Sequence, residues 1–65
     1  MSNKKKLEII MNVILEAAKL EMPSGHLYAR LMEYGLTLNA YERIIGTLEN
    51  LGAIKVKNNL ITQPN

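Results

Sequence analysis

Cysteine, tryptophan, phenylalanine and aspartate are all missing from this 65-residue sequence. Without cysteine the chain has neither a disulfide nor a thiolate metal site, and its single histidine, His26, has no second ligand at metal-binding spacing. A P-loop or dinucleotide-binding glycine pattern is also missing, and no pair of carboxylates is flanked by a pocket-forming sequence. We therefore expect a protein that is not an enzyme and uses no metal or cofactor.

Long hydrophobic runs are missing too. Residues 1–20 begin with basic residues and continue with apolar ones, as a secretory signal does, but Glu8, Asn12 and Glu16 interrupt the run at nearly regular spacing. The interruptions exclude both the apolar core of a signal peptide and a membrane span of about 20 residues. The default expectation is therefore a cytoplasmic protein with no membrane partner.

The residues that are present are enough for one small core. Hydrophobic residues make up 48% of the chain and the formal net charge is only +2, which predicts a single globular domain over residues 1–65. So short a chain buries only about 60% of the surface that its unfolded form exposes. Self-association would therefore help to stabilise it.

A first helix is predicted over about residues 5–21, because good helix formers follow one another until Pro23. Its apolar residues form two adjoining stripes, which are Leu7, Ile10, Met11, Ile14 and Ala18, and Ile9, Val13, Ala17 and Leu20. Two explanations fit so wide an apolar face. Either the rest of the chain covers the helix on several sides, or the helix pairs two copies in a homodimer. The candidate interface residues are Ile9, Val13 and Leu20.

A second helix is predicted over about residues 25–34, with Ser24 as its N-cap. Its inward positions are Leu27, Leu31, Tyr28 and Met32. Gly35 suits the left-handed residue that ends a helix.

A third helix is predicted over about residues 38–51. Either Thr37 caps it, or Asn39 and Glu42 form a capping box, and the sequence leaves both open. The residues expected to face the core are Tyr41, Ile44, Ile45, Leu48 and Leu51.

After Gly52 the apolar spacing changes from about 3.6 to 2, which predicts a β-hairpin over about residues 53–62. Its turn is Asn58-Asn59, since asparagine tolerates the positive φ that a two-residue turn requires. The inward residues are predicted to be Ile54, Val56, Leu60 and Thr62. The fold class is therefore mainly α with a small β-hairpin: a three-helix winged helix-turn-helix in which the hairpin is the wing.

A run of residues within this layout resembles a known family. The run is Gly35-Leu36-Thr37, then Tyr41-Glu42-Arg43-Ile44-Ile45, then Leu48-Glu49-Asn50-Leu51-Gly52-Ala53-Ile54. It resembles the recognition helix and the start of the wing in MarR-like and related bacterial regulators. The resemblance implies that the helix beginning at Thr37 enters the major groove of DNA, and that the wing contacts the neighbouring backbone or minor groove.

The exposed side of the third helix carries groups that bind DNA. Arg43 can donate to guanine or to a phosphate, and Asn39 can bond adenine or a phosphate near the helix N-terminus. Thr47, beside Gly46, permits close approach. Glu42 and Glu49 on the same helix would be repelled by phosphates. We interpret Glu42 as a capping residue and Glu49 as a solvated one.

Further cations lie on the wing and near the start of the chain. Lys55 and Lys57 alternate along one strand and point to the same side, next to the Asn58-Asn59 turn. They can contact phosphates and also protect a sheet edge from association. The run Lys4, Lys5 and Lys6 is either a phosphate-contacting arm or a solubilising tail.

These features predict a small sequence-specific DNA-binding protein, most simply a homodimeric transcriptional regulator whose partner is double-stranded DNA. The alternative is a winged-helix module that binds another protein. Glu42 and Glu49 beside Arg43, together with the small net charge, favour that alternative.

Overall fold

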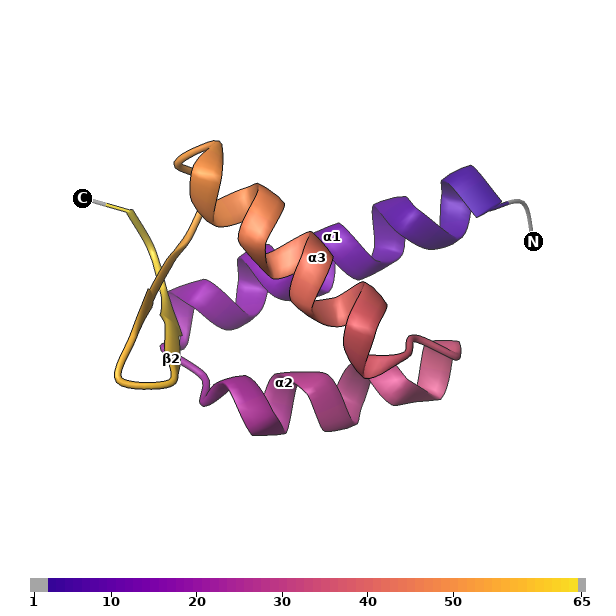
Figure 1. The fold of residues 1–65 in the computed structure, drawn as a ribbon, viewed down its shortest axis with the longest axis horizontal. Coiled ribbons are helices and arrows are strands. Elements are labelled where there is room, and N and C mark those ends of the chain that lie inside the picture. The colour runs from indigo at the N-terminus through magenta and orange to yellow at the C-terminus, as the bar shows by residue number, and fades with distance from the viewer. Residues whose placement is uncertain (1–2, 65) are drawn as a thin grey trace.

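The structure, a computed structural model, describes residues 3–64. Three helices and an antiparallel hairpin follow one another: α1 (Asn3–Lys19), α2 (Ser24–Leu31) with a 3-10 turn η1 (Met32–Tyr34), α3 (Leu38–Asn50), β1 (Lys55–Lys57) and β2 (Leu60–Thr62). In Figure 1, α1 passes behind α3, α2 lies below them, and the hairpin closes one end. The predicted mainly helical fold with a small hairpin is confirmed, and the arrangement is consistent with a winged-helix layout.

The start of α2 differs from the prediction that Ser24 is its N-cap. Pro23 occupies that position, because the Leu27 amide donates to the Pro23 carbonyl over 3.1 Å. Ser24 is therefore the first residue inside the helix, and its side chain caps no amide. Its hydroxyl bonds instead to the hydroxyl of Tyr41, 2.8 Å away on α3.

Thr37 is the N-cap of α3, so the first of the two predicted alternatives is confirmed. Its Oγ1 accepts a hydrogen bond from the Ala40 amide over 3.2 Å, and its backbone is extended. Gly35 adopts φ +79° between η1 and this cap, as predicted. Asn39 lies within the first turn of α3 rather than before it.

The hairpin has the predicted turn but a different inward face. Asn58 and Asn59 adopt φ values of 52° and 65°. Because the turn has two residues, Lys57 pairs with Leu60 and Val56 pairs with Ile61. The core face therefore continues from Val56 to Ile61, which is completely buried, whereas Leu60 and Thr62 are half-buried on the other face.

A short segment before α2 extends the hairpin on its other side. Pro23 forms a β-bridge with Leu60, the Ile61 amide donates to the Met22 carbonyl over 2.9 Å, and the Ser24 amide donates to the Asn59 carbonyl over 2.7 Å. β2 is thus bonded on both sides. β1, which carries Lys55 and Lys57, forms the outer edge.

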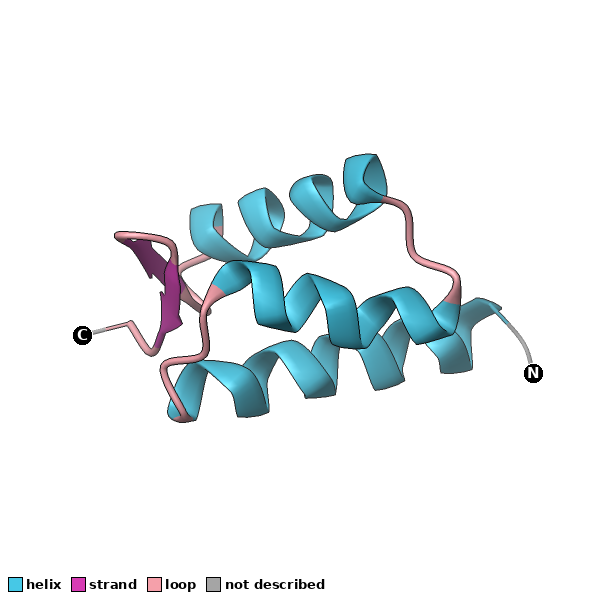
Figure 2. Cartoon of the chain, turned by 90° about the horizontal axis from the view of Figure 1, so that it is seen from below, coloured by secondary structure: helices cyan, strands magenta, loops and turns pink. Residues whose placement is uncertain are grey.

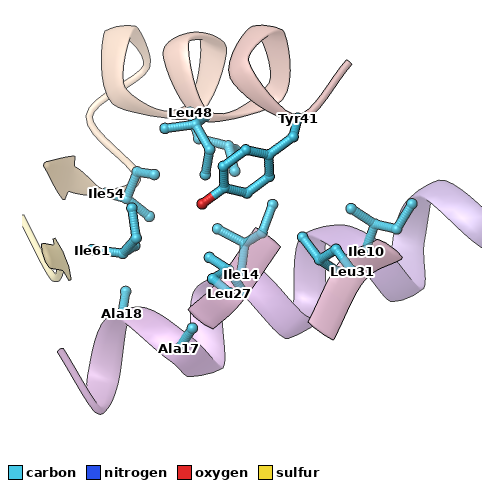
Figure 3. Close-up of a cluster of buried hydrophobic side chains, with 11 residues drawn as sticks. Ile10, Ile14, Ala17, Ala18, Leu27, Leu31, Tyr41, Leu48, Ile54 and Ile61 are labelled. Carbon is cyan, nitrogen blue, oxygen red and sulfur yellow. The ribbon is translucent and has the colours of Figure 1, made fainter. Parts of the chain in front are cut away.

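The core lies where the three helices and the hairpin meet (Figure 3). Its fully buried side chains are Ile14, Leu27, Leu31, Ile54 and Ile61. Three residues predicted to face inward are exposed instead. Leu51 is 74% exposed because α3 ends just before it, Met32 is 54% exposed in the 3-10 turn, and Leu7 is 45% exposed near the start of α1.

The wide apolar face of α1 is explained in large part by its central position. Ile10, Ile14, Ala17 and Ala18 are buried against the core. Met11 packs on the side toward α3, while Ile9 and Val13 are half-buried on the side toward α2. Figure 2, seen from below, shows α1 and α3 on opposite sides of α2.

No helix within residues 3–64 combines the length and the apolar character that crossing a bilayer requires.

Candidate nucleic-acid interface

α3 presents a polar face directly opposite its buried side. At about 100° per residue, Asn39, Arg43, Gly46 and Asn50 fall within roughly 60° of one another. The buried residues of the same helix are Tyr41, Ile45 and Leu48. The side chains of Asn39, Arg43 and Asn50 are exposed. The structure therefore brings Asn39 and Arg43 together on one surface.

Arg43 lies between two shallow hollows. One is lined by Thr37, Asn39 and Ala40 beside it, and the other by Thr47 with Leu7 and Met11 of α1. Thr47 is thus on the flank of α3 that faces α1. No carboxylate of residues 3–64 forms an ion pair with Arg43, so its guanidinium is available to a ligand.

Glu42 and Glu49 share the opposite flank of α3, and both are exposed. The interpretation of Glu42 as a capping residue is wrong. With Thr37 as the cap, the capping-box position is Ala40, and Glu42 lies two residues too late to reach the helix start. Its carboxylate takes part in none of the hydrogen bonds among residues 3–64. Both glutamates are therefore solvated negative charges beside the polar face.

Lys55 and Lys57 are exposed on one face of the hairpin, as predicted. The Thr62 hydroxyl donates to the Lys55 carbonyl over 3.2 Å and holds the two strands together. Asn58 and Asn59 are exposed at the turn. The carbonyl of Asn59 accepts from the Ser24 amide, which ties the turn to the start of α2.

The structure does not bring the two groups of predicted DNA-binding residues into one hollow. Arg43 lies in the first half of α3, whereas the wing follows the end of that helix. A helix of 13 residues is about 20 Å long, and the molecule measures 33 × 21 × 20 Å. Figure 1 shows the wing at the opposite end of the molecule from the loop that leads into α3.

Lys4, Lys5 and Lys6 belong to the first turns of α1, and their role as a phosphate-contacting arm or a solubilising tail stays a prediction. The helix begins at Asn3, two residues earlier than expected, and all three lysines are exposed on it. The Lys6 ammonium lies 3.5 Å from where a Cβ on Gly35 would be. A cation therefore stands beside the loop that leads into α3.

The predicted dimer residues share one flank of α1. Ile9 and Val13 are half-buried there, and Leu20 is 73% exposed. All three line a hollow that also includes Met22 and Arg30.

His26 is exposed on α2. No three His, Asp or Glu side chains gather into a metal-binding group within residues 3–64.

Two residues that the sequence did not single out lie against the wing. Lys19, in the last turn of α1, and Glu21, just after it, line a hollow together with Lys55 and Lys57. By helical spacing alone, Lys19 falls on the polar side of α1 with Glu8, Asn12 and Glu16. Its closeness to the wing depends on how the hairpin packs onto the end of that helix.

Comparisons of the chain with protein-family models, with curated proteins and with solved structures found no match.

Proposed function

We propose that this protein binds double-stranded DNA, with α3 in the major groove and the wing on the neighbouring backbone. The exposed face of α3 is the observation that carries the proposal. Gly46 lies in its middle, and a Cβ added there would meet nothing within 4 Å. Glycine inside a helix costs about 1 kcal/mol relative to alanine, so packing within this chain gives no reason for it. A bare backbone at this point lets a large partner approach the helix closely.

The groups around Gly46 suit the edges and phosphates of DNA. Arg43 has the fork of donors that matches guanine or a phosphate, and it has no ion-pair partner among residues 3–64. Asn39 lies in the first turn of α3, where backbone amides and the helix dipole favour a phosphate. Direct base contacts from these two residues are the basis of the proposed sequence specificity.

The acidic residues of α3 determine which flank can meet a phosphate. Glu42 and Glu49 repel phosphates and lie on one flank, whereas Thr47 lies on the other. We therefore expect the helix to meet the DNA backbone on the side of Thr47. Because both carboxylates lie on the same side of the polar face, they do not prevent the other side from contacting phosphates.

The resemblance to MarR-like regulators supports the same role. It covers the loop before α3, the helix itself and the start of the wing. These are the elements that the family uses to contact DNA, and a part in transcription regulation follows from the same resemblance.

Fluorescence anisotropy with a labelled pool of random-sequence duplexes at low salt tests the proposal. The wild type is expected to bind, with an affinity that falls as salt rises. Arg43→Ala should weaken binding several-fold. The matched control is Arg30→Ala, which removes the same charge from the exposed surface of α2. Because Arg30 also lines the hollow of the predicted dimer residues, the molar mass of this variant is measured first, and at an unchanged mass it should bind like the wild type.

Two results would overturn the proposal. One is the failure of the wild type to bind any duplex at low salt, which would favour the protein-binding alternative. The other is an equal affinity for the Arg43 and Arg30 variants, which would show that α3 does not make the contact.

A further inference from the structure

We propose that a hollow at the base of the wing binds a phosphate group of the DNA backbone, and that Glu21 limits the affinity of this site. The base-of-wing hollow is lined by Ala18, Lys19, Glu21, Lys55, Lys57, Thr62 and Gln63. The inference rests on the proposed DNA-binding function. It adds a contact between the end of α1 and the backbone that lies apart from α3.

Three lysines from two elements converge on this hollow. Lys55 and Lys57 come from the outer face of β1, and Lys19 comes from the last turn of α1. Neither Lys55 nor Lys57 forms an ion pair with a carboxylate of residues 3–64. Lys19 is 3.3 Å from Glu16, but both side chains are mostly exposed, and such surface pairs exchange readily with a competing anion. All three ammonium groups are therefore free to turn toward a phosphate.

The hollow is held in shape by hydrogen bonds on both sides. The Thr62 hydroxyl bonds the Lys55 carbonyl, and the Ile61 amide bonds the Met22 carbonyl, so the wing is fixed against the chain that leaves α1. At the end of α1, the Ala17 and Ala18 carbonyls accept from amides that follow the helix. Three lysines against the one carboxylate of Glu21 give the hollow a net positive charge.

Both the backbone conformation and the charge of Glu21 are unfavourable at its position in this hollow. The Met22 amide donates to the Ala17 carbonyl and the Glu21 amide to the Ala18 carbonyl, at 3.1 and 3.2 Å, which is the helix-ending pattern usually completed by glycine. Glu21 has φ +52° in the position where that glycine is expected. A negative charge at the C-terminal end of a helix is also unfavourable.

A residue kept in a strained conformation suggests a use that offsets its cost. Beside three lysines, the Glu21 carboxylate weakens the attraction of the hollow for any phosphate, whatever the DNA sequence. Because this contact is the same in specific and non-specific complexes, Glu21 lowers both affinities by the same factor. The contacts of α3 with bases then supply a larger share of the total affinity, and they alone set the ratio of specific to non-specific binding.

The salt dependence of binding to the random-duplex pool tests the inference. Lys19→Ala is expected to lower the affinity several-fold and to reduce the slope of log affinity against log salt by about one unit. Glu21→Gln keeps the backbone strain but removes the charge, and it should raise the affinity several-fold at low salt. Glu8→Gln is the matched control, since it removes one negative charge from the opposite half of α1 and should change the affinity much less.

Amide chemical-shift mapping supplies a second readout and confirms that each variant is folded. Adding a short duplex to the wild type should move the amide signals of Lys19 and Glu21 as well as those of Lys55 and Lys57. In Lys19→Ala the shifts at the wing should shrink, while those at Asn39 and Arg43 should persist.

The inference and the proposed function fail in different ways. In one outcome, the wild type binds DNA and Arg43→Ala weakens binding, but Lys19→Ala and Glu21→Gln have no more effect than Glu8→Gln. The base-of-wing hollow would then not be a phosphate site, while the proposed contact of α3 with DNA would stand. If the wild type does not bind duplex DNA, the proposed function falls, and the inference falls with it.

Discussion

The hydroxyl of Tyr41 joins the starts of two helices. It donates to the carbonyl of Ser24 over 3.0 Å, and since its one proton is used there, it accepts from the Ser24 hydroxyl over 2.8 Å. Its ring also lies 5.2 Å from the ring of Tyr28, at an interplanar angle of 46°. Figure 3 shows this hydroxyl pointing away from α3 into the interior. A single side chain thereby fixes α3 relative to α2.

Replacing Tyr41 with phenylalanine should lower the free energy of unfolding by about 1–2 kcal/mol, because it removes both hydrogen bonds and keeps the ring. The control is Tyr34→Phe, at a half-buried tyrosine whose hydroxyl bonds no group within residues 3–64. Denaturant unfolding at pH 7 measures both. Equal stability of the two variants would mean that the bonds to Ser24 contribute little.

The same side chain predicts how stability changes with pH. Burial raises the pKa of Tyr41, and the hydrogen bond from Ser24 offsets part of the rise by favouring the phenolate. The folded state then holds the proton more tightly than the unfolded state. Its contribution to stability is complete below about pH 10 and is lost as the pH rises through the raised pKa. The stability of the wild type should therefore fall more steeply above about pH 10 than that of Tyr41→Phe.

At the scale of a single element, α3 combines a locally unfavourable glycine with an exposed polar face. Gly46→Ala should raise the free energy of unfolding by about 0.5–1 kcal/mol, since an added Cβ meets nothing in the chain. The same change should weaken DNA binding, because the methyl group would stand between the helix and the groove. Thermal unfolding and fluorescence anisotropy measure the two effects.

Gly25→Ala is the matched control for this substitution. Gly25 lies in α2, and a Cβ there would also meet nothing within 4 Å. This variant should gain stability and leave DNA affinity unchanged. If Gly46→Ala also bound DNA like the wild type, close approach at α3 would be the wrong explanation for Gly46.

The elements could be predicted from the sequence where their signals are local. Thr37 was one of two caps that the sequence offered for α3, and Gly35 and the Asn58-Asn59 turn each act within a few residues of their own position. Ile61 was missed because the alternation of period 2 was continued through the turn, although the predicted two-residue turn itself pairs Val56 with Ile61 and puts both on one face. The bridge between Pro23 and Leu60 joins distant parts of the chain, and no periodicity reports it.

For the candidate site too, local features could be predicted from the sequence and contacts between distant segments could not. Helical spacing was enough to place Asn39 and Arg43 on one face of α3, because the period of a helix fixes which residues share a face. Lys19 and Glu21 were missed because their meeting with Lys55 requires the hairpin to pack on the end of α1. Contacts within one element were therefore predictable, whereas contacts between elements were not.

At the scale of the whole molecule, α1 is the helix against which α2, α3 and the hairpin all pack. One flank of α1 shares a hollow with α2 and the other shares a hollow with α3, which crosses in front of α1 in Figure 1, and the hairpin packs on the end of α1. This position accounts for Ile10, Ile14 and the two buried alanines. It leaves Leu20 unexplained, because that side chain is 73% exposed at the end of the α2 flank.

Leu20 is therefore the sharpest test of the predicted homodimer. It shares a hollow with Ile9 and Val13, and a second copy covering this flank would bury all three. A chain of 65 residues gains proportionally more from such burial than a large domain does. A two-fold pair would also present two copies of α3, as recognition of symmetric half-sites requires.

Molar mass in solution decides the matter. The wild type is expected at twice the 7.3 kDa of one chain, and Leu20→Glu at the mass of one chain, because an ionised carboxylate in an apolar interface is strongly unfavourable. Leu51→Glu is the matched control, since Leu51 is 74% exposed at the end of α3 and its variant should keep the mass of the wild type. A wild type with the mass of one chain would contradict the dimer. If it still bound duplex DNA, the α3 surface would act as a single recognition unit.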